Sequence, residues 1–276
     1  MIELPEALTI ARQINEAVAG KTVARVLPPT KPHKFCWFNG DAAEYESQLQ
    51  GATLLSAEGF GIYAEMSFDN GKKLAINDGV NLRLSDGSPA PRSYQLLIEF
   101  TDGMALVFTV AMYGGIVLHG GDYDNEYYRK SRGYISPFAP EFESLYRHAL
   151  AAYKPTMSAK AFLATQQRFP GIGNGVSQDI LLAAGIHPKR KLQTLDSAAQ
   201  DKLLKSMVSV LSDMVEGGGR DTEKDIFGNP GGYITRMSNK TLDTGCPACG
   251  GPITKETYLG GSVYYCANCQ PLAEPR

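Results

Sequence analysis

The chain has 276 residues, of which 43% are hydrophobic and 20% are charged, and its formal net charge at pH 7 is −2. This composition is ordinary for a globular protein with a full core, and no apolar run approaches the roughly 20 residues that a membrane-spanning helix needs. A secretory signal has a basic region followed by an apolar one, and the N-terminus shows no such pattern. We therefore expect a cytoplasmic protein without a membrane partner.

Charge is distributed unevenly along the chain. Residues 154–240 contain twelve Lys and Arg against eight Asp and Glu, whereas residues 1–153 contain 13 against 18. A basic middle segment could attract phosphate groups although the whole chain is acidic, but an uneven solvated surface would give the same counts.

The first half of the chain predicts one helix followed by short strands. Residues 5–19 have the apolar spacing of an amphipathic helix, with Pro5 in its first turn. Segments of β character follow at residues 21–28, 52–59, 62–68, 73–78, 94–100, 104–114 and 115–121. Many short strands at this spacing predict a sandwich or barrel-like first domain.

From about residue 140 the hydrophobic period becomes helical. Four helices are predicted, at residues 141–153, 158–167, 175–185 and 197–218. The stretch 217–233, "GGGRDTEKDIFGNPGGY", is too rich in glycine for a regular element and predicts a mobile loop.

Four of the five cysteines lie near the C-terminus, in two C-x2-C pairs separated by sixteen residues. The four are Cys246, Cys249, Cys266 and Cys269. Two such pairs can deliver four thiolates to one tetrahedral zinc ion, which leaves no position for water or substrate and therefore predicts one structural Zn²⁺. A redox pair or unliganded thiols are the alternative.

A second motif, "FPGIGNGVSQDILLAAGIHPKRK", places a tight glycine turn before the third predicted helix. Backbone N–H groups at Gly173 and the side-chain amide of Asn174 suit a phosphate at a helix start. Lys189, Arg190 and Lys191 add positive charge after the helix. The pattern predicts a clamp on a DNA backbone, but a glycine-rich interhelical turn with a solvated basic end would look the same.

Taken together, the motifs resemble those of the formamidopyrimidine-DNA glycosylase/endonuclease VIII family of base-excision repair proteins. "ELPEA" at the N-terminus, "GIGNGVSQDILLAAGIHP" and "CPACGGPI…YYCANCQ" occur in the family's order, over essentially the whole chain. The resemblance implies an α+β multidomain fold with three parts. These are an N-terminal β-sandwich with an N-terminal helix (residues 1–138), a helix-two-turn-helix domain (139–238) and a zinc-finger β-hairpin (239–276).

The resemblance also implies where the chemistry lies. In such enzymes an N-terminal proline amine attacks C1′ of the damaged nucleotide, and a neighbouring glutamate acts on the deoxyribose. Glu3 and Glu6 match the family's two glutamates, whereas Ile2 stands in the place of the proline. Removal of Met1 generally needs a small second residue, so the amine of Met1 becomes the candidate nucleophile, displaced by about 3.5 Å of chain.

Three further positions depart from the family pattern. Ile62 stands where a lysine is expected, and Gly261 stands where the zinc hairpin carries an arginine. "TVAMYGG" leaves Tyr113 as an aromatic DNA contact without a neighbouring arginine. Trp37 is expected in the core, with a stacking surface as its alternative.

Three functions therefore remain open. The first is a DNA glycosylase for oxidised bases, with or without strand cleavage (AP-lyase activity), that uses the Met1 amine or a water activated by Glu3. The second is a catalytically silent protein that binds damaged DNA, and the third is the same fold turned to a partner other than DNA. The expected partner is damaged double-stranded DNA, bound by a monomer in the cytoplasm, at the nucleoid if the source is bacterial.

Overall fold

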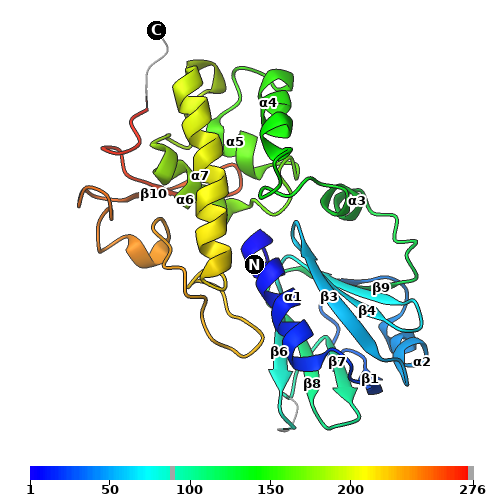
Figure 1. Cartoon of the computed structure of the whole chain (residues 1–276). Helices are drawn as coiled ribbons and strands as arrows, with labels where there is room; N and C mark the ends of the chain where they lie inside the picture. Colours follow the sequence, from blue (N-terminus) through cyan, green and yellow to red (C-terminus); the bar gives the residue numbers. More distant parts are fainter. Residues whose placement is uncertain (88–90, 273–276) are drawn as a thin grey trace. The chain divides into compact units, whose positions relative to one another are not determined.

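The computed structural model describes residues 1–87 and 91–272, which form two compact units (Figure 1). Unit 1 comprises residues 1–132 together with 218–232. Unit 2 comprises residues 133–217 and the chain from Tyr233 onward. The predicted division at residues 138 and 238 stays a prediction, and the last four residues of its third part, 273–276, lie outside the described residues.

Unit 1 contains two β-sheets. The five-stranded sheet has the order β2-β9-β5-β4-β3 and the four-stranded sheet the order β1-β7-β8-β6. The strands are β1 (Val23–Leu27), β2 (Cys36–Phe38), β3 (Leu54–Phe60), β4 (Tyr63–Phe68), β5 (Lys73–Asn77), β6 (Val80–Ser85), β7 (Leu96–Phe100), β8 (Ala105–Val110) and β9 (Gly114–His119). All neighbouring strands pair antiparallel except β2 and β9, which run parallel.

One hydrophobic core joins the two sheets to helix α1 (Leu4–Val18). Ile10 and Ile14 of α1 lie in it with residues of both sheets, such as Met66 of β4 and Leu106 of β8. In Figure 1 the blue helix α1 lies beside β3. The approach is close at Gly59 of β3, where a Cβ atom would lie 2.5 Å from the carbonyl oxygen of Ala7.

Two short helices complete the first 132 residues. Helix α2 (Tyr45–Leu49) follows a 3-10 turn at Ala42–Glu44. Helix α3 (Glu126–Arg132) is attached to unit 1 by a buried carboxylate, that of Glu65 on β4. Glu65 accepts a hydrogen bond from the hydroxyl of Tyr128 and lies 3.2 Å from Nε2 of His119.

The segment 218–232 contains no helix or strand, as the sequence predicted, but it is attached to unit 1 by specific contacts. Ile226 is fully buried in the core of unit 1, and its carbonyl accepts a bond of 2.7 Å from the N–H of Leu84 on β6. Asp225 accepts a 3.0 Å bond from the side chain of Gln13 on α1. These contacts explain why residues so late in the chain belong to the first unit.

Unit 2 contains four helices and a β-hairpin among its described residues. The helices are α4 (Phe142–Ala152), α5 (Ala159–Ala164), α6 (Asn174–Ala184) and α7 (Ser197–Glu216). The hairpin pairs β10 (Thr254–Tyr258) with β11 (Gly261–Tyr265), and short 3-10 turns occur at Leu192–Thr194 and Asn239–Thr241. Helix α6 ends at Gly185, whose φ of +71° lies in the left-handed region that glycine enters without strain.

The predicted fold class is therefore confirmed: a β-sheet unit with an N-terminal helix, a helical region and a C-terminal hairpin with clustered cysteines. The predicted helices and strands are all present, with ends shifted by a few residues. The sequence analysis did not predict β2, β6, α2 and α3. In the described part of the chain, no helix combines the length and the apolar character needed to cross a membrane.

Replacing Gly59 by Ala should destabilise unit 1 by about 1–3 kcal/mol, because the new methyl group would overlap backbone atoms of α1 that cannot move independently. Urea unfolding followed by the fluorescence of Trp37, the one tryptophan of the chain, measures this cost. Gly120→Ala is the control, since its Cβ atom would meet nothing closer than 3.8 Å. Equal stability of the two variants would contradict the packing described here.

Candidate active site and metal centre

Glu3 and Glu6 lie at the start of helix α1, and both are buried, with 4% and 6% of their surfaces exposed. The N–H of Glu3 donates a 3.1 Å hydrogen bond to Oε2 of Glu6. This carboxylate thereby pairs one of the N–H groups that have no partner within the helix at its N-terminal end. The positive end of the helix dipole favours negative charge there. That effect is too small to compensate for two carboxylates removed from water.

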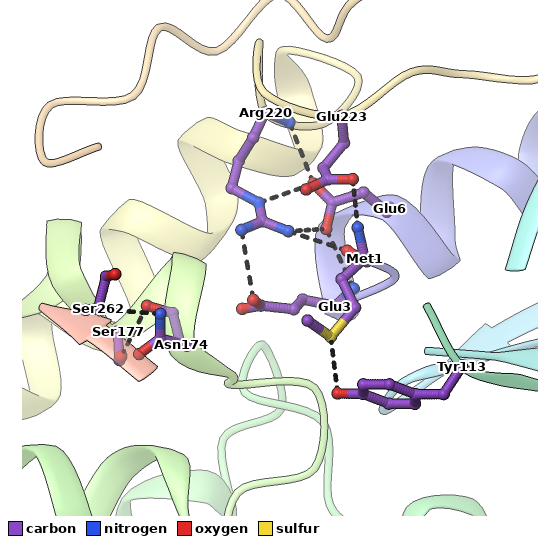
Figure 2. A network of polar contacts seen from close by, with 9 residues as sticks. All are labelled: Met1, Glu3, Glu6, Tyr113, Asn174, Ser177, Arg220, Glu223 and Ser262. Carbon is purple, nitrogen blue, oxygen red and sulfur yellow. Dashed lines mark hydrogen bonds and ion pairs between the residues drawn. The ribbon is translucent and has the colours of Figure 1, made fainter. Parts of the chain in front are cut away.

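The compensating charge comes from Arg220, more than 210 residues away in the sequence and itself only 3% exposed. Its Nε and Nη2 atoms donate to the two oxygens of Glu6 at 2.9 and 2.8 Å, and its Nη1 atom donates to Oε1 of Glu3 at 3.3 Å. Nη2 also donates to the carbonyl oxygen of Met1 at 3.2 Å. Figure 2 shows the guanidinium directed at both carboxylates. Unit 1 therefore contains a buried Glu3–Arg220–Glu6 cluster.

This cluster keeps Arg220 charged. Burial alone would lower the pKa of Arg220, but the charges of Glu3 and Glu6 outweigh burial and raise the pKa above its ordinary value. The planar guanidinium matches both oxygens of Glu6 at once, a geometry that a lysine ammonium cannot reproduce.

The first two residues are held by separate contacts within unit 1. The amino group of Met1 forms an ion pair with Glu223, and its sulfur lies 3.4 Å from the hydroxyl of Tyr113 (Figure 2). The N–H of Ile2 donates a 2.6 Å bond to the carbonyl of Asp78, and the side chain of Ile2 is buried in the core. The isoleucine is therefore a core residue, and its nitrogen is an amide bound to Asp78.

Tyr113 and Asp78 are also connected through the backbone. The N–H of Gly79 donates to the carbonyl of Tyr113 at 3.0 Å, and a Cβ atom on Gly79 would lie 2.5 Å from that oxygen. Burial raises the pKa values of both Tyr113 and Asp78. The turn between β5 and β6 thus positions both the N-terminus and Tyr113.

In unit 2, Asn174 begins helix α6 directly after its N-cap residue Gly173. Its Nδ2 atom donates a 3.0 Å bond to the carbonyl of Ser262 in the hairpin, whereas its Oδ1 atom is buried without a hydrogen-bond partner. A Cβ atom on Gly261 would lie 3.3 Å from that oxygen. The side-chain amide that the sequence analysis assigned to DNA therefore contacts the hairpin of its own unit in this structure.

The three cations after α6 have different environments. Lys189 forms a 2.7 Å ion pair with Glu256 of β10, and Nε of Arg190 donates to the hydroxyl of Thr194 at 3.2 Å. Lys191 is exposed. The side chains of Lys189 and Arg190 thus have partners within their own unit. For these two residues the contacts favour an interhelical turn over a clamp on a DNA backbone.

The four clustered cysteines bring their sulfur atoms within 4.8 Å of one another. The Sγ atoms of Cys246 and Cys269 are 3.8 Å apart, and those of Cys249 and Cys266 are 3.5 Å apart. Tetrahedral coordination with bonds of about 2.3 Å to sulfur requires sulfur–sulfur distances of about 3.8 Å. The four residues therefore fit one tetrahedral metal ion.

The four thiols also interact with one another. The N–H of Gly251 and the thiol of Cys269 lower the pKa of Cys249, whereas donation to Cys249 raises the pKa of Cys269. A bound metal ion would replace the thiol protons. Within the described residues this is the one group of His, Cys, Asp and Glu side chains with metal-binding spacing.

Comparison with known proteins agrees with this architecture. The family model for the formamidopyrimidine-DNA glycosylase N-terminal domain matches residues 1–133. The formamidopyrimidine-DNA glycosylase of Cytobacillus firmus is 28% identical over 285 residues, which cover 98% of this chain and 100% of the relative. That of Bordetella pertussis is 27% identical over 279 residues, which cover 98% and 99%. Residues 1–133 thus match the N-terminal domain of this family, and nearly the whole chain is similar in sequence to the two enzymes.

Solved structures show the same fold. The complex of Lactococcus lactis Fpg with DNA containing an abasic site matches with a TM-score of 0.82 at 23% identity, over 97% of this chain and 99% of that one. A complex of a point mutant of that enzyme with DNA containing Fapy-dG matches with a TM-score of 0.84 at 22% identity, over 98% and 99%.

Glu3, Glu6 and the four clustered cysteines were predicted from the sequence, but Arg220 and Glu223 were not. Both missed residues lie in a stretch that was interpreted as a mobile loop. The alternating charges of "GRDTEKD" were the one available signal, but charged loops are usually solvated. Ile62, where the resemblance led us to expect a lysine, is 7% exposed and packs against Phe60, Tyr63 and Tyr128.

Replacing Arg220 by Ala should destabilise unit 1 by about 3–5 kcal/mol, because it leaves two buried carboxylates without a counter-charge. Arg12→Ala is the matched control: Arg12 pairs with Glu16 on the exposed face of α1, and its loss should cost about 0.5 kcal/mol or less. Urea unfolding monitored at Trp37 compares them.

A third variant tests the cause of the loss. Glu3→Gln and Glu6→Gln combined with Arg220→Met removes all three charges, and most of the lost stability should return. If Arg220→Ala lowered the free energy of unfolding no more than Arg12→Ala does, the cluster would not stabilise the N-terminus in solution.

Proposed function

We propose that this protein is a DNA glycosylase of base-excision repair that binds damaged double-stranded DNA as a monomer in the cytoplasm. The similarity to formamidopyrimidine-DNA glycosylases over almost the whole chain supports the activity. Solved proteins of the same fold are bound to DNA that contains an abasic site or Fapy-dG. The observation that carries the proposal is the grouping of Met1, Glu3 and Tyr113 at the start of α1.

The proposed chemistry uses the amine of Met1 and the carboxylate of Glu3. A primary amine in its neutral form is a nucleophile that can attack a carbon atom and form a Schiff base. The amine nitrogen would bond to C1′ as the bond from C1′ to the base breaks. The base would leave with the electron pair of that bond and take a proton from solvent. Glu3 would accept a proton from the attacking nitrogen and pass it to O4′ as the bond between C1′ and O4′ breaks, which opens the ring and leaves a protonated Schiff base between amine and sugar. The ion pair with Glu223 must open before the amine can react.

One observation favours a second function, that of a catalytically silent protein that binds damaged DNA. Oε1 of Glu3 accepts a bond from Arg220, and the nitrogen of residue 2, where the resemblance places the nucleophile, is an amide that donates to Asp78. A carboxylate oxygen that already accepts a bond from a buried guanidinium is less free to contact the sugar than an unbonded one. Both functions share the substrate and differ in whether a covalent bond forms.

DNA contacts in unit 2 are proposed at Gly173 and Asn174, at the start of α6, and at the exposed Lys191. Lys189 and Arg190 would contribute positive potential, since each already has a partner on the protein. Tyr113 would contact the DNA from unit 1. Each phosphate contact adds to the salt dependence of binding, so weak salt dependence would count against this assignment.

For the metal we propose one structural Zn²⁺ at Cys246, Cys249, Cys266 and Cys269. Zinc favours a tetrahedral site of four thiolates, and with four protein ligands it offers no open position for chemistry. Its role would be to hold the hairpin of β10 and β11, a segment too small to fold by itself.

Borohydride trapping on a duplex that contains an abasic site tests the proposed chemistry. The wild-type protein should form a covalent adduct, and mass spectrometry of the trapped peptide should locate it at the amine of Met1. Glu3→Gln should slow adduct formation by about 100-fold or more. Glu16→Gln, on the exposed face of the same helix, should leave the rate unchanged. Tight binding with neither adduct nor released base would reject the glycosylase in favour of the silent protein.

Ile2→Pro sharpens that test. Proline permits removal of Met1, which would place a secondary amine where the N–H of Ile2 now lies, 2.6 Å from the carbonyl of Asp78. We expect faster adduct formation, since the amine then occupies the position that the family resemblance implies. Intact mass must first show that Met1 has been removed. A correctly processed variant that traps no faster than wild type would show that the position of the amine does not limit the reaction.

Metal analysis of the purified protein should find one zinc per chain. Cys249→Ser should lower this content, whereas Cys36→Ser should preserve it, because Cys36 lies on β2 in unit 1. Chelation should increase hydrogen exchange in β10 and β11 while leaving β3 to β5 protected, since the ion holds the hairpin alone. A metal-free protein with a fully protected hairpin would contradict a structural zinc.

A further inference from the structure

Strand β2 of unit 1 exposes an unusual side chain. Cys36 and Phe38 pack against the core of unit 1, and because side chains alternate along a strand, Trp37 between them faces outward. Trp37 is 53% exposed, although the sequence analysis expected it in the core. That expectation was wrong.

The exposed tryptophan has apolar neighbours from a distant part of the chain. Because β2 pairs with β9, Trp37 lies opposite Gly115, and the ring centroids of Trp37 and Tyr113 are 6.4 Å apart at an interplanar angle of 54°. Phe35 and Met112, at the ends of the same two segments, are 48% and 67% exposed. We call Phe35, Trp37, Met112 and Tyr113 the aromatic ledge.

Single exposed apolar residues are common, but a cluster that two separate segments build together indicates a binding surface. Glycine at positions 114 and 115 is required for this arrangement. A Cβ atom on Gly114 would lie 2.7 Å from the side chain of Val80, and one on Gly115 would lie 3.0 Å from that of Asn77. The backbone that carries Tyr113 is therefore held against the neighbouring strands.

The charge on the Trp37 side of the ledge favours a nucleic acid strand, whereas Tyr113 lies near the carboxyl groups of Asp78 and Glu3. Residues 28–40 include Lys31 and Lys34 but no acidic residue, and Nζ of Lys34 lies 5.4 Å from the ring centroid of Phe35. Aromatic faces flanked by flexible cations are the usual surface for unpaired nucleotides, because the bases stack while the cations attract the phosphates.

The ledge is continuous with the candidate active site. Its member Tyr113 contacts the sulfur of Met1 through its hydroxyl, and the backbone of Tyr113 is bound to the same turn that holds Ile2. A strand that reached the N-terminus of α1 would therefore find the ledge beside it, within the same unit.

We propose that Trp37, supported by Tyr113, stacks on an unpaired base of a DNA strand bound beside the N-terminus. This inference rests on the proposed function insofar as the ligand is DNA, but it requires neither catalysis nor damage. It assigns a base-binding role to β2.

The experiment uses the full chain and a single-stranded oligothymidine, with Trp37 as the internal reporter because the chain has one tryptophan. Stacking should quench the fluorescence of Trp37 in a saturable manner. Trp37→Ala should weaken binding of the labelled oligonucleotide, measured by anisotropy, by about 5- to 100-fold, and Trp37→Phe should retain most of the affinity.

Tyr127→Ala is the matched control, since Tyr127 is a 49% exposed aromatic on α3 of the same unit, and its affinity should equal that of wild type. A second reporter, Tyr127→Trp in a Trp37→Phe background, should show no quenching.

Two outcomes would overturn the proposal. One is binding of the oligonucleotide without quenching and with unchanged affinity in Trp37→Ala. The other is a dimer that Trp37→Ala dissociates while DNA binding persists, which would make the ledge a protein interface. Failure of the proposed function is distinct from both, because the protein would then bind neither this strand nor a duplex with an abasic site.

Discussion

The N-terminus of this protein depends on the buried contact between one guanidinium and two carboxylates. Glu3 and Glu6 lie at the start of α1 with almost no exposed surface, and Arg220 donates to both of them and to the carbonyl of Met1. Carboxylates removed from water without a counter-charge would oppose folding strongly. The segment 218–232 must therefore lie on unit 1 in order to bring Arg220 to α1, and the burial of Ile226 contributes the apolar part of the same attachment.

The same contact also limits the chemistry available there. Oε1 of Glu3 already accepts a bond from Nη1 of Arg220, so this oxygen is not free to contact a bound sugar. The amine of Met1 is likewise held by Glu223. The ion pairs fix the positions of Glu3 and Met1 but leave both groups less free to move. Such a conflict between stability and activity is common at functional sites. Whether the substrate displaces Arg220 decides between the two proposed functions.

In unit 2, polar residues typical of DNA contact also hold the cysteine hairpin. Asn174 binds the carbonyl of Ser262, Lys189 pairs with Glu256, and Gln178 of α6 accepts a 2.6 Å bond from the N–H of Tyr264. Helix α6 and the hairpin are thus held together by polar contacts, and the proposed metal would add the rigidity that so few residues cannot supply by packing. Any DNA contact at the start of α6 depends on this attachment.

The sequence by itself determined the elements with a strong local signal. Helix α1, the four helices of unit 2 and most strands follow from the hydrophobic period. The spacing of the cysteines predicts their clustering, because residues near in sequence create these patterns. Strand β2 has three residues, too few to show a period, so the outward direction of Trp37 could not be predicted. Only the tertiary structure paired Arg220 with Glu6, since a contact across 214 residues leaves no local pattern and its energy appears only once both groups are buried.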